Sequence, residues 1–197
     1  MRATLKILID EGYKAISLRK IAAACGMKVG NVTYYFATKD QLIQETLDAT
    51  MVSYAEAFAQ IYHNTTMSPE KKMTQMIVFV LEDIQTRKTT RLFPELWALA
   101  NNDTFVAGLV ERVYEIERSS LRTVINELNP DLDEEETQAL AIFVSSSLEG
   151  TTMFAGYEKP WTHKMPWLTN IAIKSLVSFV KSATSDDIRG MPDQASA

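Results

Sequence analysis

The positions of proline constrain the fold of this chain more than any other feature of its sequence. Proline disrupts a helix interior because it lacks an amide donor and its ring clashes with the preceding turn. The first 68 residues contain no proline, and the later prolines separate segments whose apolar residues recur every three or four positions. No hairpin dipeptide lies between alternating apolar runs, so strands are not expected. We therefore expect an all-α protein, interrupted at Pro69, Pro94, Pro130, Pro160, Pro166 and Pro192.

Capping residues set the expected helix boundaries. Ser17 precedes one helix, Thr38 and Gln41 form a capping box before a long one, and Ser68 begins another. The acidic run after Asp133 suits the positive end of a helix dipole. The polar tail from residue 185 is expected to be frayed. The expected helices span residues 4–11, 18–25, 29–36, 39–62, 69–87, 94–101, 104–128, 134–156 and 166–183.

Charge is distributed unevenly along the chain. The net charge is −5, which taken alone argues against a nucleic-acid-binding protein. Residues 1–40, however, contain seven Lys and Arg against three Asp and Glu, whereas residues 41–197 contain 13 against 22. This basic N-terminal part on an acidic body either marks the end of the chain that meets an acidic partner or is a chance fluctuation of charge in a short window.

Several classes of protein and of site are not expected. The single cysteine, Cys25, excludes an internal disulfide framework and a cysteine-based zinc cluster. His63 and His163 lie far apart in sequence, and no catalytic constellation or phosphate-binding loop accompanies them, so we expect no enzyme activity, metal or cofactor. No apolar run approaches the roughly 20 residues that span a bilayer, and the start lacks the features of a signal peptide. We expect a cytoplasmic protein that does not bind a membrane.

Residues 17–42 have the pattern of a helix-turn-helix. Leu18, Ile21 and Ala22 share one face of the first short helix, and Val32 and Phe36 share one face of the second. The glycine between the two helices permits the positive φ that a tight turn requires. Small residues, including Cys25, are expected to pack where the helices cross. In such a motif the second helix enters the major groove of DNA.

The outward face of that second helix has an unusual composition for a solvated helix. It has no acid, and its polar groups are suited to bases and phosphates. Asn31 matches the edge of an adenine, and the lack of a side chain at Gly30 lets a phosphate approach the backbone. The alternative is that the tyrosines pack in the core. The face consists of Val29, Gly30, Asn31, Thr33, Tyr34 and Tyr35, and it is flanked by Lys28 and Lys39.

The segment from residue 26 to residue 42 resembles the signature of the TetR family of bacterial transcriptional regulators. Residues 12–13 and 17–22 resemble the family's preceding motif. Lys28 replaces the usual serine cap, Thr33 replaces the usual tyrosine, and the first helix is about ten residues shorter than usual, so we expect that it is truncated. The matching residues are Gly26, Gly30, Tyr35, Phe36, Lys39 and Leu42, with conservative replacements at Met27, Asn31, Val32, Thr38 and Asp40.

The resemblance implies roles for individual residues in DNA binding. Ser17, Tyr35 and Lys39 would contact phosphates. Val29 lacks a hydrogen-bonding group, so its plausible partner is a thymine methyl. The positions facing base edges would be Arg19, Val29, Asn31 and Tyr34.

The last two expected helices are apolar on two sides. Either they are central in a monomer, or they bury a partner. The resemblance implies that they pair with their copies in a four-helix dimer interface. The expected interface residues are Ile142, Ser146, Met153, Ile173, Val177, Phe179 and Val180.

The middle helices are rich in large flexible and aromatic side chains. Each of these residues alone is more consistent with a core, but together they suit an adaptable apolar cavity. The resemblance implies a pocket for a small-molecule effector that lowers DNA affinity. From the lining we expect a mostly apolar or aromatic effector. The helix that begins at residue 38 would transmit the change, because it both adjoins the recognition helix and extends into the body. The expected pocket residues are Met51, Tyr54, Phe58, Met76, Phe79, Phe93, Trp97, Phe105, Tyr114, Ser147 and Phe154.

These expectations combine into one hypothesis and two alternatives. We expect a three-helix DNA-binding domain over residues 1–45, a six-helix effector-binding and dimerisation domain over residues 46–184, and a flexible tail over residues 185–197. The expected function is that of a ligand-responsive repressor, a homodimer on a palindromic double-stranded DNA operator. The first alternative is a DNA-binding regulator without an effector, controlled by a protein partner. The second is an enzyme or carrier that uses the helical body.

Overall fold

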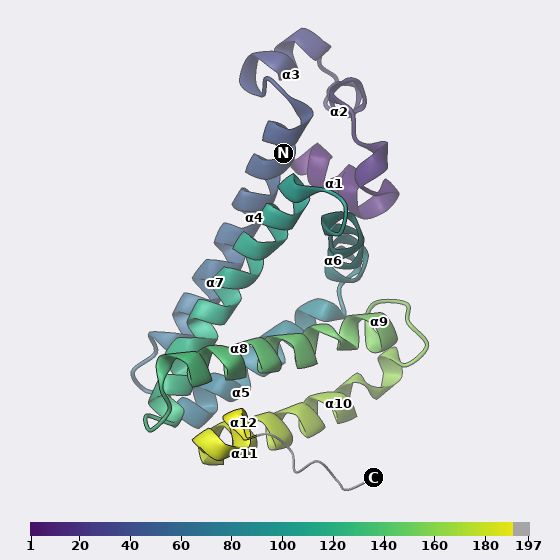
Figure 1. Ribbon diagram of the computed structural model, residues 1–197. Coiled ribbons are helices and arrows are strands. Elements are labelled where there is room, and N and C mark those ends of the chain that lie inside the picture. Colours follow the sequence, from purple (N-terminus) through teal and green to yellow (C-terminus); the bar gives the residue numbers. More distant parts are fainter. Residues whose placement is uncertain (191–197) are drawn as a thin grey trace, which may run out of the picture. The chain divides into compact units, whose positions relative to one another are not determined.

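The computed structural model describes residues 1–190, and helices joined by short turns make up this part of the chain (Figure 1). No strand occurs among the residues described, in agreement with the expected all-α class. The chain divides into two compact units, the first of residues 1–56 and 86–116 and the second of residues 57–85 and the chain from residue 117 onward. This division does not coincide with the expected boundary at residue 45.

The first unit surrounds one apolar core. Leu8, Ile21 and Ile43 are almost fully buried there, together with Leu92 and Val106 from later in the chain. The N-terminal helices therefore share their core with segments more than 40 residues away. The unit consists of α1 (Arg2–Glu11), η1 (Tyr13–Ala15), α2 (Leu18–Ala24), α3 (Val29–Tyr35), the first part of α4 (Lys39–Tyr62), α6 (Arg87–Ala100) and the first part of α7 (Thr104–Leu128).

Helix α6 is bonded directly to the segment that follows α1. A carboxylate oxygen of Glu95 accepts a hydrogen bond from the Tyr13 amide at 2.6 Å. Gly12 has a φ of 86°, and a Cβ there would lie 2.6 Å from the same oxygen, so a side chain would block the contact. Arg87, at the other end of α6, forms an ion pair with Asp10 at 2.6 Å. Two polar contacts thus hold α6 against the N-terminal helices.

The second unit is arranged around α5. This helix contacts α8, α10 and η3, and its apolar face, with Met73 and Ile77, is completely buried. The Ser68 side chain caps its start by accepting from the Lys71 amide at 3.3 Å, as the sequence predicts. The unit contains the last part of α4, α5 (Pro69–Ile84), the last part of α7, α8 (Glu134–Glu149), α9 (Thr151–Ala155), η2 (Thr162–Lys164), α10 (Met165–Ala172), η3 (Ile173–Val177), α11 (Ser178–Ser182) and α12 (Ser185–Arg189).

Helix α6 begins earlier than the sequence predicts. We expected a helix from Pro94, but Pro94 lies inside α6, and the preceding helix ends at Ile84. The Thr86 side chain caps α6 by accepting from the Thr89 amide at 3.3 Å. Burial of the α6 apolar face, including Leu92, offsets the hydrogen bond that the proline removes.

The C-terminal part also differs from expectation. The helix expected over residues 134–156 is interrupted at Gly150, and part of the expected flexible tail forms α12. Arg189 of α12 pairs with Asp133 and, at 2.7 Å, with the nearly buried carboxylate of Glu136. The α12 segment is therefore held on the start of α8. The rest of the expected tail, residues 191–197, lies outside the described residues.

A buried carboxyl group lies within the second unit. Glu117, on α7, is 7% exposed, and its Oε1 atom has no hydrogen-bond partner. Burial raises the pKa of Glu117 to about 7, against the opposing hydrogen bond from Ser145 and the charge of Arg118. The protonated form is therefore favoured in the folded protein at acidic pH.

We expect the stability of the protein to fall as the pH rises from 5 to 8. The folded state binds the Glu117 proton more tightly than the unfolded state, whose pKa is near 4.5. The stabilisation is therefore present below pH 4.5 and is lost as the pH approaches 7, an effect of up to about 3 kcal/mol. Urea unfolding at fixed protein concentration measures it, with Glu117→Gln as the control that removes this pH dependence. Equal pH dependence in both proteins would contradict the assignment.

Candidate nucleic-acid interface

Helices α2 and α3 form the helix-turn-helix that the sequence predicts. Ile21, Ala22 and Val32 are buried, and Phe36 packs partly buried against the same core. Gly26, in the turn, has a φ of 66°, which favours glycine. The Ser17 hydroxyl caps α2 by accepting from the Lys20 amide at 3.2 Å, a role that leaves Ser17 exposed at the helix start.

The outward face of α3 is open to solvent. Tyr34 is 82% exposed and Tyr35 66% exposed, with their rings edge to face at 5.1 Å. The tyrosines therefore do not pack in the core, which removes that alternative. Val29 and Asn31 are also exposed. Such an exposed pair of aromatic rings with no acidic neighbour on its helix is suited to a polyanionic partner.

The start of α3 carries little stabilisation of its own. Lys28 occupies the cap position and makes no side-chain capping hydrogen bond. The Thr33 hydroxyl donates to the Gly30 carbonyl at 3.2 Å, so it is engaged within the helix. Gly30 has no positive φ, and a Cβ added there would meet no atom within 4 Å. Neither packing nor backbone conformation within the protein requires glycine at this position.

Lys39 lies at the beginning of α4. Its ammonium group lies over the ring of Tyr13, 4.6 Å from the centroid, and the side chain is half-buried. In the predicted capping box, the side chain of Gln41 bonds to the backbone of Ala37, one residue before the expected Thr38. The Thr38 hydroxyl accepts from the Gln41 amide at 3.1 Å, but Gln41 Oε1 accepts from the Ala37 amide at 2.9 Å.

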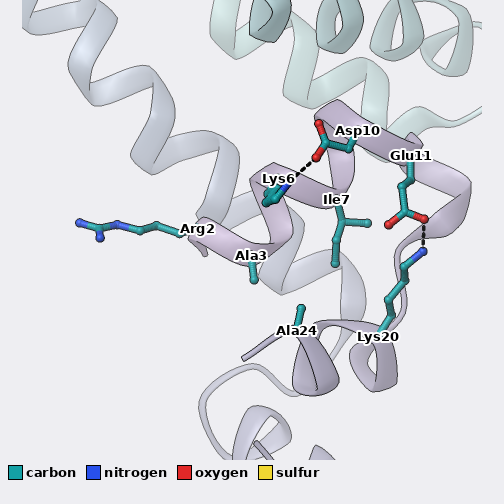
Figure 2. A pocket seen from close by; sticks show the side chains of 8 residues that line it. All are labelled: Arg2, Ala3, Lys6, Ile7, Asp10, Glu11, Lys20 and Ala24. Carbon is teal, nitrogen blue, oxygen red and sulfur yellow. Dashed lines mark hydrogen bonds and ion pairs between the residues drawn. The ribbon is translucent and has the colours of Figure 1, made fainter. Parts of the chain in front are cut away.

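A surface pocket of about 420 Å³ lies between α1 and α2 (Figure 2). Its wall has two ion pairs, Lys6 with Asp10 and Lys20 with Glu11. The side chain of Arg2 extends away from both ion pairs (Figure 2). Two of the N-terminal cations are thus neutralised within the protein, whereas Arg19 and Lys28 are exposed.

Two features of this region were not foreseen. Cys25, the C-cap residue of α2, is exposed, so the prediction that it packs between the helices was wrong. The contacts of Tyr13 with Lys39 and Glu95 were missed, although the resemblance included Tyr13. Met27, also exposed, extends the open surface beyond α3.

The residues expected in an effector pocket fall in both units. In the first unit, Phe93 is buried and Trp97 donates to the Tyr114 hydroxyl at 2.8 Å. In the second unit, the rings of Phe58 and Phe79 meet edge to face at 5.2 Å. Of the others, Met51 and Met76 are buried, Tyr54 and Phe105 are half-buried, and Ser147 and Phe154 are exposed.

The exposure of Ser147 and Phe154 argues against their placement in an interior pocket. Phe154 is 66% exposed, and the Ser147 hydroxyl donates to the Phe143 carbonyl within α8. Both lie on the solvent side of helices whose opposite faces fill the core. Helical spacing alone did not distinguish the two faces.

The expected dimer residues are open to solvent with one exception. Ile142, Met153 and Phe179 are large apolar side chains that are between 36% and 50% exposed. Ser146 is exposed, and Ile173 and Val177 are half-buried. Val180 is fully buried within the second unit, so its assignment to an intermolecular surface was wrong. Its carbonyl accepts from the Asn129 amide group at 2.9 Å, which fixes that face of α11 inward.

Within residues 1–190, no helix is both long and apolar enough to cross a membrane. The same part of the chain contains no group of three or more His, Cys, Asp or Glu side chains placed to hold a metal ion.

Comparison with known proteins identifies both parts of the chain. Residues 1–46 match the family model of bacterial regulatory proteins, tetR family, and residues 69–165 match that of the C-terminal part of BetI-type transcriptional repressors. The chain is 24% identical to an uncharacterised HTH-type transcriptional regulator of Xanthobacter autotrophicus over 156 residues, which cover 77% of this chain and 75% of that protein.

Solved structures show the same fold. A putative transcriptional regulator from Pseudomonas aeruginosa has a TM-score of 0.72 at 17% identity, over 95% of this chain and 90% of that one. The transcriptional regulator FadR from Bacillus subtilis, in complex with stearoyl-CoA, also has a TM-score of 0.72, at 14% identity over 90% of this chain and 95% of that one. Because the matched models and relatives are transcriptional regulators with a helix-turn-helix, the chain belongs to the TetR family of DNA-binding bacterial transcriptional regulators.

Proposed function

We propose that this protein is a ligand-responsive repressor that binds a palindromic operator as a homodimer in the cytoplasm. The observation that carries the proposal is the open, acid-free face of α3, where Tyr34 is 82% exposed. Asn31 and Tyr34 would contact base edges, and Arg19 would contribute another base contact. Tyr35 and Lys39 would contact phosphates and fix the register on DNA.

The exposed apolar side chains of the second unit support the dimer. Phe143 and Phe179, whose rings are 6.0 Å apart, are both partly open to solvent. Large exposed apolar patches on a water-soluble surface are typical of protein interfaces. A two-fold dimer would present two copies of α3 to successive major grooves, roughly 34–36 Å apart.

The aromatic side chains of the two units support a small-molecule effector. The Phe93, Trp97 and Tyr114 group in one unit and the Phe58 and Phe79 pair in the other offer apolar and polarisable surface. The FadR structure contains stearoyl-CoA, which favours an effector with a long apolar part. A regulator without an effector, controlled by a protein partner, is the second candidate.

An effector would act by displacing α4 or α6. Helix α4 follows α3 directly, and α6 is bonded to the N-terminal helices through Glu95 and Arg87. The coupling must be reciprocal: an effector that lowers operator affinity tenfold is itself bound tenfold more weakly by the operator complex, about 1.4 kcal/mol.

We expect Gly30→Ala to stabilise the protein and weaken its binding to DNA, which tests the assignment of α3. Alanine is a better helix former by roughly 0.5 kcal/mol, and its Cβ meets nothing in the protein. On the DNA-facing side the added methyl group would hold the helix away from the duplex, for an affinity loss of about tenfold. Thermal unfolding and titration of a random-sequence duplex measure the two effects.

Gly108→Ala is the matched control for this experiment. Gly108 lies within α7, where an added Cβ would meet only the Arg112 side chain at an ordinary 3.7 Å. This variant should gain stability and keep its DNA affinity. Unchanged DNA binding by Gly30→Ala would show that α3 does not approach the duplex at this residue.

We expect Phe179→Glu to produce a monomer that binds DNA poorly. A charge buried without a partner in an apolar interface costs several kcal/mol, so dimer dissociation should increase at least a hundredfold. Sedimentation velocity and DNA titration measure the outcome. Val52→Glu, at a 55% exposed apolar residue of α4 outside the proposed interface, should leave the dimer intact. A Phe179→Glu protein that remains dimeric would place the interface elsewhere.

A further inference from the structure

We propose that Tyr13 is a positioning residue for DNA binding, because its ring holds the Lys39 ammonium group where it can meet a phosphate. This inference rests on the proposed phosphate contact of Lys39. The ammonium lies 4.6 Å from the centroid of the Tyr13 ring. At that distance the negative face of an aromatic ring attracts a cation. Tyr13 is 7% exposed, whereas Lys39 is half-buried, so the ring forms a fixed support for a side chain that still reaches solvent.

The backbone on both sides of Tyr13 is anchored. Its amide donates to Glu95 at 2.6 Å, and its carbonyl accepts from the Ile16 amide at 3.2 Å. Gly12, immediately before it, leaves the space that the Glu95 carboxylate occupies. The ring therefore has little freedom to move with Lys39. The contact instead restricts the side chain of Lys39.

The Tyr13 ring remains uncharged under physiological conditions. Burial, and then the nearby charges of Asp40 and Asp103, raise the pKa of its phenol above the ordinary value. A neutral ring retains its attraction for an ammonium group, and it does not compete with a phosphate for the ammonium's positive charge.

Ordering the Lys39 side chain before DNA binds lowers the entropic cost of its contact with a phosphate. A free lysine side chain has many rotamers and loses this freedom when it binds a phosphate. Loss of part of this rotamer freedom before binding would raise affinity about threefold for each subunit, hence about tenfold for a dimer that uses both. Because Glu95 lies on α6, movement of that helix would also shift Tyr13 and with it the support for Lys39.

A double-mutant cycle tests the inference with a random-sequence DNA duplex as the probe. Tyr13→Leu removes the ring but keeps an apolar side chain, and Tyr13→Phe keeps the ring. We expect about tenfold weaker binding for Tyr13→Leu, little change for Tyr13→Phe, and little further loss when Tyr13→Leu is added to Lys39→Ala. The salt dependence of binding should fall in Lys39→Ala by about one phosphate contact per half-site.

A purely structural role for Tyr13 gives a different result. Tyr13→Leu would then weaken binding equally with Lys39 and with alanine at position 39, and this additivity would overturn the proposal. If Tyr13→Leu does not fold, a pentafluorinated phenyl ring at position 13 keeps the shape but removes the negative face. Normal DNA affinity with that ring would also overturn it. A Lys39→Ala protein with unchanged affinity and salt dependence would instead refute the phosphate contact on which the inference rests.

Discussion

One hydrogen bond, from the Tyr13 amide to the Glu95 carboxylate, joins the start of the chain to a helix 82 residues later. It forms because Gly12 has no side chain and adopts a positive φ. The DNA-binding helices belong to a compact unit that also includes residues 86–116. They share a core with α6 and the first part of α7. The proposed effector response depends on this arrangement, because movement of α6 would then reach the core beneath α2 and α3.

The sequence predicted the parts of the structure that depend on neighbouring residues. The turn at Gly26, the cap at Ser17 and the inward position of Val32 are local features, and the structure contains all three. The start of α6 was not predicted, because Pro94 was expected to begin a helix, whereas α6 begins seven residues earlier, after the Thr86 cap. The partners of Glu95 and the inward face at Val180 depend on contacts between distant segments. Periodicity contains no information about which apolar face meets which partner.

Helix α3, whose outward face is the candidate DNA-binding surface, has little stabilisation of its own. Helix α3 begins at Lys28 without a side-chain cap, contains Gly30 where alanine would fit, and exposes Tyr34 and Tyr35. The missing cap and the glycine each weaken a short helix that could not persist alone. The core beneath, through Val32, supplies the stability that α3 lacks. Residues that disfavour a helix are expected on an exposed surface when that surface binds a partner.

The most direct measurement is selection of bound sequences from random duplex DNA by the purified protein. If two copies of α3 read base edges across a two-fold axis, the selected sequences will contain an inverted repeat whose half-sites are centred one helical turn apart, roughly 34–36 Å, or a multiple of it. The hydroxyl group of Tyr34 and the side-chain amide of Asn31 would specify its bases. A pool that remains random after selection, or a single half-site without a repeat, would contradict the account.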